Sequence, residues 1–270
     1  MDDFIKIKDP KEATQFEKPK YLKLLPYTPV RVRILDSVPY MTHKHYIPSA
    51  NISILCLGDE CPICQRNNEL VKANPGVKYA NIKGLIPRQE RYMVNVYNRT
   101  YVKVTSMGTI VYANLEGEFP TSYEGESLIG IEPKPLNQVE VLERGYELFA
   151  ELQILHKTVV NASNERVGIN NFDVILIYPG GKSSPKAQPT AFMDDVNVPP
   201  ESYYVLSSLG IQLTPSEVEK VLHGVRLKDI FASRKESDTL TDAEHMLESA
   251  SVDTAANVAS IFASPFDEEE

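Results

Sequence analysis

Long hydrophobic runs are missing from this 270-residue chain, and so is tryptophan. A membrane-spanning helix needs about 20 consecutive apolar residues, and no segment approaches that length. The first residues, MDDFIKIKD, are acidic and polar, unlike the apolar stretch of a secretory signal peptide. We therefore expect a protein that makes no membrane contact.

Recognisable catalytic motifs are also missing. Carboxylates are plentiful, but none of them form a nuclease motif. The segment PGGKSSP lacks the leading glycine spacing of a phosphate-binding loop, so we interpret it as a surface loop. We expect a protein that is not an enzyme.

Cysteine is scarce, and its three copies crowd into residues 56 to 64. Four residues separate Cys56 from Cys61, two separate Cys61 from Cys64, and the upstream segment THKHY adds His43 and His45. Three Cys and one His form a common ligand set for structural zinc. The spacing predicts a zinc site with His45 as the preferred fourth ligand and His43 as the alternative. Clustered thiols without a disulfide framework favour a reducing cytoplasm.

Other interpretations of the cysteine cluster fit less well. The segment CPIC has the C-x-x-C form of thiol redox proteins, but it follows a turn-like GDE and leaves the third cysteine unused. The zinc deaminase signature requires H-x-E, whereas this chain has His43-Lys44-His45, with Pro62 inside the cysteine pair. Three unrelated buried thiols would not explain the clustering.

Basic residues are fewer than acidic ones, and the formal net charge is −9. The charged residues are, however, unevenly distributed along the chain. Residues 1–112 carry 17 Lys and Arg against 10 Asp and Glu, a balance of +7, and the remainder has a balance of −16. Residues 236–270 contain ten acidic residues and no Lys or Arg. We expect a basic body, able to contact nucleic acid, with an acidic tail.

Short strand patterns dominate from residue 27 onward. In TPVRVRIL, Val30, Val32 and Ile34 alternate with Arg31 and Arg33, so the two sets face opposite sides of a strand. RYMVNVYNRTYVKVTS predicts two strands that pair around an Asn-Arg turn, and FDVILIY predicts a buried strand before a flexible loop. YELFAELQILHKTVV has high strand content, although its first half is also compatible with a helix.

Helical patterns are few. CQRNNELVKAN predicts a short helix, and TPSEVEKVLHGV predicts one with Thr214 or Ser216 near its N-cap. Many strands and few helices indicate a mainly β protein, either a small β-barrel or a sandwich, with a zinc-stapled insertion. We expect an N-terminal arm at 1–24, a core at 25–235 with a zinc subdomain at about 43–75, and a disordered acidic tail at 236–270.

Aromatic and basic residues interleave in the first half of the chain. Proteins that bind single strands need cations along the phosphates and rings for base stacking, worth about 1–3 kcal/mol per base. The candidate DNA contacts are Lys20, Lys23, Arg31, Arg33, Lys44, Tyr46, Arg88, Arg91, Tyr92, Tyr97, Arg99, Tyr101 and Lys103. The alternative is an ordinary sheet surface, since both residue types are common on strands. No motif for reading the major groove of a duplex is visible.

The acidic tail ends in SIFASPFDEEE, where two phenylalanines stand among acids. A purely solubilising tail needs no phenylalanine, so we expect a protein-docking tip. Its candidate residues are Phe262, Phe266, Asp267, Glu268, Glu269 and Glu270. The tail's charge could also occupy a basic groove when DNA is absent.

These features together resemble the single-stranded-DNA-binding proteins of phages, in particular the helix-destabilising type of T-even phages. The resemblance rests on VRVRIL, a His, a Cys, CPIC followed by Gln, RYMVNVY and the acidic tail. It implies an oligonucleotide-binding (OB) barrel, a zinc held by His45, Cys56, Cys61 and Cys64, and a tail that recruits replication proteins. The spacing between Cys56 and Cys61 is shorter than the spacing between the first two cysteines of the T-even type. The basic Lys-Arg-Ser-Thr cluster of that family's N-terminal arm is missing from this chain.

The function we expect is sequence-tolerant binding of single-stranded DNA in phage DNA replication, recombination and repair. The protein would act in the cytoplasm of the infected bacterial host, associate with itself on DNA, and recruit replication or recombination proteins through its tail. The alternative is a zinc-containing transcription or replication accessory factor whose metal-binding segment docks on a polymerase.

Overall fold

A computed structural model describes residues 19–181, 183–191 and 194–234. This part of the chain divides into two compact units. Unit 1 contains residues up to 45, 53–56 and 87–211, and unit 2 contains residues 46–52, 57–86 and those from 212 onward. The acidic tail at 236–270, with all six candidate docking residues, and most of the N-terminal arm lie outside the described residues.

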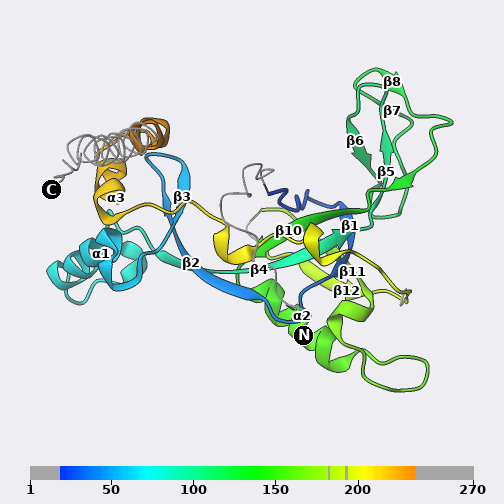
Figure 1. The fold of residues 1–270 in the computed structure, drawn as a ribbon, viewed down its shortest axis with the longest axis horizontal. Helices are drawn as coiled ribbons and strands as arrows, with labels where there is room; N and C mark the ends of the chain where they lie inside the picture. Colours follow the sequence, from blue (N-terminus) through cyan, green and yellow to red (C-terminus); the bar gives the residue numbers. More distant parts are fainter. Residues whose placement is uncertain (1–18, 182, 192–193, 235–270) are drawn as a thin grey trace, which may run out of the picture. The chain divides into compact units, whose positions relative to one another are not determined.

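A seven-stranded antiparallel sheet is built around one long strand, β4 (Arg88–Asn98). The strand order is β12 (Lys186–Pro189), β11 (Asp173–Ile177), β1 (Pro29–Ile34), β4, β2 (Tyr40–Ile47) and β3 (Ile52–Leu55), and β10 (Gln138–Arg144) pairs with β4 as well (Figure 1). One edge of β4 pairs with β2 over its first half and with β1 at its end, while β10 takes the other edge.

This sheet is not a closed barrel. Closure requires the two end strands of a sheet to pair with each other. Among the described residues, β12 and β3 end the strand order without a shared ladder. The predicted OB-like barrel is therefore wrong, whereas the prediction of a mainly β protein with a few short helices is confirmed.

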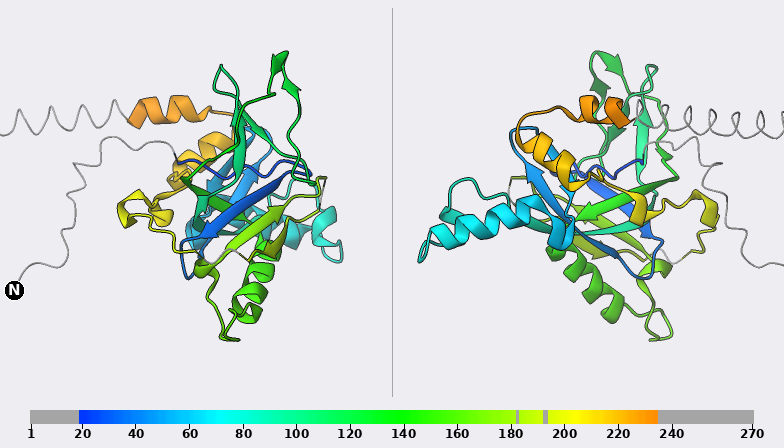
Figure 2. Two further views of the ribbon diagram at one scale, coloured as in Figure 1. Left: turned by 90° about the vertical axis from the view of Figure 1, so that its right-hand side faces the viewer. Right: turned by 60° about the vertical axis from the view of Figure 1, so that its left-hand side comes forward.

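One hydrophobic core of unit 1 lies on one face of this sheet, and Met93, Val141, Leu206 and Leu209 form a separate buried cluster. Val30, Val32 and Ile34 are buried together in the core, as their alternation predicts. The segment with ambiguous periodicity forms the helix α2 (Tyr146–Thr158), which lies beside the strands of the sheet (Figure 2). Leu148, Phe149 and Leu152 of this helix are buried in the same core as the strand residues. Their spacing places these three side chains on one helical face, and packing on the sheet selects the helix.

The strand that follows β4 leaves its sheet. β5 (Tyr101–Val104) pairs with β6 (Ile110–Tyr112) and β9 (Lys134–Pro135) in a separate three-stranded sheet, and β7 (Ser122–Tyr123) pairs with β8 (Glu126–Ser127). The two strands predicted around Asn98 exist, but their predicted pairing is wrong. At Asn98 both edges of β4 are already occupied, by Val32 of β1 and by Gln138 of β10.

Unit 2 contains the helices α1 (Pro62–Ala73) and α3 (Pro215–Leu222), which pack on each other. Thr214 is the N-cap of α3: its hydroxyl accepts a hydrogen bond from the Glu217 amide, and the Glu217 carboxylate accepts one from the Thr214 amide. This capping box confirms the predicted helix start. Arg234 also donates two hydrogen bonds to the Glu217 carboxylate.

Short 3₁₀ turns complete the described chain, at Gly58–Glu60, Tyr79–Asn81, Ile169–Asn171, Pro200–Ser202 and Leu206–Ser208. Leu22 and Leu24, from the end of the predicted arm, are buried in the core of unit 1. None of the described helices combines the length and apolarity needed to cross a bilayer.

Candidate metal centre and nucleic-acid interface

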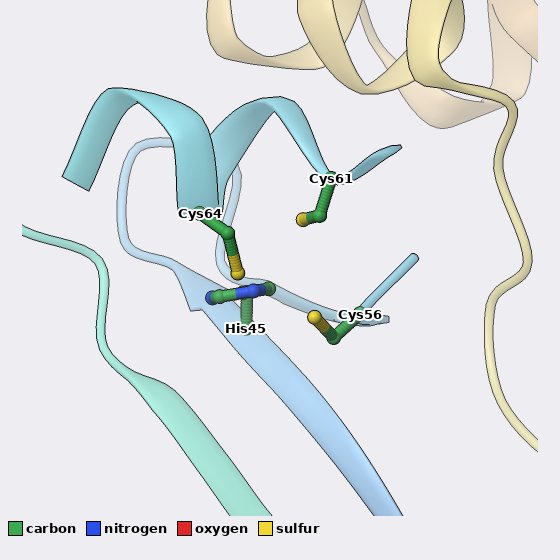
Figure 3. Close-up of side chains that lie close together, drawn as sticks. All are labelled: His45, Cys56, Cys61 and Cys64. Carbon is green, nitrogen blue, oxygen red and sulfur yellow. The ribbon is translucent and has the colours of Figure 1, made fainter. Parts of the chain in front are cut away.

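Four side chains of the predicted metal site lie close together, and we call them the metal cluster: His45, Cys56, Cys61 and Cys64. Their ligand atoms all lie within 4.8 Å of one another, and the side chains point toward one another (Figure 3). A tetrahedral ion with sulfur ligands at about 2.3 Å separates those sulfurs by about 3.8 Å. The metal cluster is therefore compact enough to bind a metal ion after small adjustments.

Local structure explains why these residues converge. The Cys56 amide donates a hydrogen bond to the His43 carbonyl (2.9 Å), which holds the end of β3 beside β2. A turn with Gly58 at φ +67° then leads to Cys61, the N-cap of α1. Cys64 lies three residues further, in the first helical turn, so both thiols of the C-x-x-C segment lie on the same side of the helix.

The structure also distinguishes between the two candidate histidines. His45 is fully buried within the metal cluster. Among the described residues, the group able to hold a metal includes His45 and not His43. His43 contributes its backbone carbonyl to the position of Cys56 instead.

Three of the candidate DNA contacts meet at a buried carboxylate, and we call them the arginine network. Asp173 is fully buried and accepts hydrogen bonds from Arg31 Nε (2.5 Å), Arg33 Nε (2.8 Å) and Arg99 Nη1 (3.0 Å). The Arg33 side chain is only 3% exposed. A guanidinium buried in this way holds β1 to β11 rather than facing a phosphate in solvent.

The outer part of the arginine network is more accessible. Arg99 Nη2 donates to the Asp194 carboxylate (2.6 Å), which is half exposed. This hydrogen bond lowers the pKa of Asp194 to about 2, despite the opposing effect of burial, and it raises the pKa of Arg99. The pair therefore stays ionised at neutral pH.

The remaining candidate contacts are spread over β2, β4, β5 and the segment before β1. Lys44 donates to the Glu143 carboxylate (2.8 Å), and Lys103 donates to the Leu128 carbonyl (2.9 Å). The hydroxyl of Tyr46 donates to Asn51, and that of Tyr92 donates to Glu90. Lys23, Arg88 and Tyr101 are exposed, and Arg91 lines a separate cleft.

Lys20 and Tyr97 do come together, in a cleft of unit 1 with a volume of about 1050 Å³. Tyr203 and Tyr204 line the same cleft, which we call the aromatic cleft. Polar groups from Asn137, Gln138, Asn197, Ser202 and Ser208 also line it, together with the acidic Glu201. The cleft thus combines three aromatic rings, one lysine and several neutral hydrogen-bonding groups.

Tyr204 is held firmly in the aromatic cleft. Its backbone amide donates to Asn95 Oδ1 (2.9 Å), and its carbonyl accepts from Asn95 Nδ2 (3.1 Å). Its hydroxyl accepts a hydrogen bond from the Lys20 amide (3.2 Å). Sequence reasoning missed Tyr203 and Tyr204, because they stand outside the basic stretches. The adjacent tyrosines after Pro199-Pro200 were the available signal.

No protein-family model matches this chain, and the curated proteins yield no significant match. Its function must therefore be inferred from the metal cluster and the clefts of unit 1.

Proposed function

We propose that the protein binds single-stranded DNA in the aromatic cleft. The supporting observation is that Tyr97, Tyr203 and Tyr204 line one cleft beside Lys20. Bases of a single strand can stack on tyrosine rings without regard to sequence, while a cation contacts the phosphates. Bases inside a duplex are already stacked and paired, so the same rings give little affinity for double-stranded DNA.

We propose zinc as the ion of the metal cluster. Three thiolates and one imidazole are the soft ligand set that zinc prefers, whereas calcium and magnesium prefer oxygen ligands. Four protein ligands complete a tetrahedron and leave no open position for substrate, which favours a structural role. The ion would order residues 45–64, and other residues would bind the DNA.

The biological setting is proposed from the resemblance and from the composition of the tail. The protein would act without catalysis in phage DNA replication, recombination and repair, inside the host cytoplasm. Phe262 and Phe266, flanked by acidic residues, would dock on replication or recombination proteins.

Fluorescence anisotropy with labelled oligo-dT and a matched duplex tests the proposed DNA binding. We expect oligo-dT to bind more tightly, and Tyr97→Ala to weaken it by about 1–3 kcal/mol, the contribution of one stacked base. Tyr79→Ala is the matched control, because Tyr79 is 50% exposed and lies outside the aromatic cleft. Equal affinity for duplex and single strand would instead support an accessory factor.

A further inference from the structure

A second cleft of unit 1 is lined by arginines that take no part in the arginine network. Its volume is about 870 Å³. Arg91 of β4, Arg144 at the end of β10, Tyr146 at the start of α2 and Tyr178 after β11 contribute to its walls. We call it the arginine cleft.

The two arginines of this cleft have no carboxylate partner within the part of the chain that the structure describes. Arg91 Nη2 donates to the Gln89 side chain (2.6 Å), and Arg144 Nη1 donates to the Glu143 carbonyl (2.8 Å). The Glu143 carboxylate is instead bonded to Lys44. Neither arginine therefore forms an ion pair in the cleft, although the charge of Glu143 still acts on Arg144 from a distance.

The two charges also repel each other. Burial lowers the pKa of Arg144, and the positive charge of Arg91 lowers it further. Like charges held close together in a partly buried position are unfavourable, and an anion placed between them would relieve the repulsion. A phosphate suits this position, because guanidinium groups form paired hydrogen bonds with its oxygens.

The surroundings supply further donors and rings. Gly145 is the N-cap of α2 and offers no side-chain cap, and the first residues of the helix line the cleft. Backbone N–H groups at a helix start favour anions. Tyr146 is 64% exposed, with Tyr92 at 6.2 Å between ring centroids. One opposing charge, Glu147, also lines the cleft.

We propose that the arginine cleft binds a nucleotide unit, with its phosphate between Arg91 and Arg144 and its base against Tyr146 or Tyr178. This inference does not depend on the aromatic cleft, since the two clefts share no lining residue. The nucleotide could be free, or it could belong to a DNA strand.

Titration calorimetry of the full chain with dTMP tests the proposal, with thymidine as the ligand that lacks the phosphate. We expect dTMP to bind and thymidine to bind at least about tenfold more weakly, because the charge-assisted hydrogen bonds are lost. Arg91→Gln and Arg144→Gln should each weaken dTMP binding by about tenfold or more. Arg166→Gln, at an exposed arginine of unit 1 that does not line the cleft, should leave it unchanged.

Two further variants separate the contributions within the cleft. Glu147→Gln should tighten dTMP binding, because it removes the opposing charge. Tyr146→Ala should weaken binding of dTMP but not of inorganic phosphate. Melting temperatures of all variants show whether each one folds.

Competition identifies the source of the nucleotide. If dTMP displaces oligo-dT, and Tyr97→Ala leaves dTMP binding intact, the arginine cleft holds part of a bound strand. If dTMP and oligo-dT bind together, the cleft serves free nucleotides. The proposal is overturned if the wild-type protein binds neither dTMP nor phosphate, or if Arg91→Gln and Arg144→Gln bind both like the wild type.

Discussion

Unit 1 uses its arginines in two opposite ways. In the arginine network, Arg31, Arg33 and Arg99 surround the buried Asp173 at hydrogen-bonding distance. In the arginine cleft, Arg91 and Arg144 have no carboxylate partner among the described residues, and they repel each other. All five residues are strand arginines or lie within one residue of a strand, so position in the sheet does not separate the two groups.

The two groups of arginines differ in whether a carboxylate lies at hydrogen-bonding distance. The network's three arginines share the carboxylates of Asp173 and Asp194, and Asp173 links β11 to β1 through Arg31 and Arg33. Removal of the buried carboxylate leaves uncompensated buried charge. The cleft's arginines gain nothing comparable from the fold, so their charge remains available for a ligand. Basic residues on a strand therefore indicate nucleic-acid binding only where no acidic residue neutralises them.

The largest effect is expected at the metal cluster, whose residues belong to neither arginine group. Purified protein should carry about one zinc per chain, and Cys64→Ser should lose it. Structural zinc contributes about 10 kcal/mol or more to small zinc modules, so the melting temperature should fall markedly. Metal analysis and thermal melts measure both quantities.

His43→Ala is the matched control for the metal prediction, because His43 lies on the same strand but outside the metal cluster. It should keep the ion. If Cys64→Ser retains both its metal content and its melting temperature, the metal cluster is not a structural site.

The second prediction breaks the arginine network. Asp173→Ala leaves three guanidinium groups without their shared buried carboxylate, and we expect it to lower the free energy of unfolding by about 3–5 kcal/mol. Urea denaturation measures the change. Arg144→Gln is the comparison, and it should change the stability by no more than about 0.5 kcal/mol, because it removes a charge without a carboxylate partner. Equal effects of the two substitutions would contradict the division into two groups.

Local sequence patterns predicted local structure well. The alternation of Val30, Val32 and Ile34 identified the buried face of β1, and Thr214 identified the start of α3. The spacing of Cys61 and Cys64 identified two converging thiols. Each of these features depends on residues within about one helical turn or two strand positions, so a single sequence contains the necessary information.

Long-range partners could not be predicted in the same way. Asp173 lies 140 residues from Arg33, and Tyr204 lies 109 residues from Asn95. Strand order and register bring these pairs together, and neither leaves a local pattern. The same limit explains the wrong barrel and the wrong pairing of β5, since both depend on which strands occupy the edges of β4.

The third prediction uses an ion pair of intermediate exposure in unit 2. Arg234 and the cap of α3 lower the pKa of Glu217 to about 2, from an ordinary value of 4.5. The ionised carboxylate therefore stabilises the folded state above about pH 4.5, and this contribution is lost as the pH falls toward 2. We expect Glu217→Gln to cost about 1–2 kcal/mol at pH 7, since Arg234 is partly exposed and solvent weakens the pair.

Urea denaturation of wild type and Glu217→Gln between pH 7 and pH 2 measures this contribution. The difference between the two proteins should shrink as the pH falls. A difference that is constant over this range would mean that the charge of Glu217 contributes nothing to stability.

The fourth prediction separates the two arginine groups by the salt dependence of oligo-dT binding. Each cation that contacts a phosphate displaces counterions, so its removal reduces the slope of log affinity against log salt by about 0.7 for a single strand. If the arginine cleft holds part of a bound strand, Arg144→Gln should flatten the slope for oligo-dT. Arg33→Gln should leave the slope unchanged while it lowers stability, because its guanidinium is buried against Asp173. A flatter slope for Arg33→Gln would show that the arginine network opens to DNA.

The smallest effect is expected from the acidic tail, and it tests which arginines the tail's charges can reach. A tether can raise the local concentration of the tail to about the millimolar range, so its ten acidic residues would compete with ligands for uncompensated cations. Deletion of residues 236–270 should tighten dTMP and oligo-dT binding several-fold, most clearly at low salt, where screening is weakest.

In a protein that carries both Arg91→Gln and Arg144→Gln, the same deletion should leave dTMP binding unchanged, because the cations that attract the tail are gone. Phe266→Ala in the full chain should abolish capture of partner proteins and leave DNA affinity nearly unchanged. If the deletion has equal effects with and without the two arginines, the tail acts elsewhere on the molecule, and the arginine cleft is not its target.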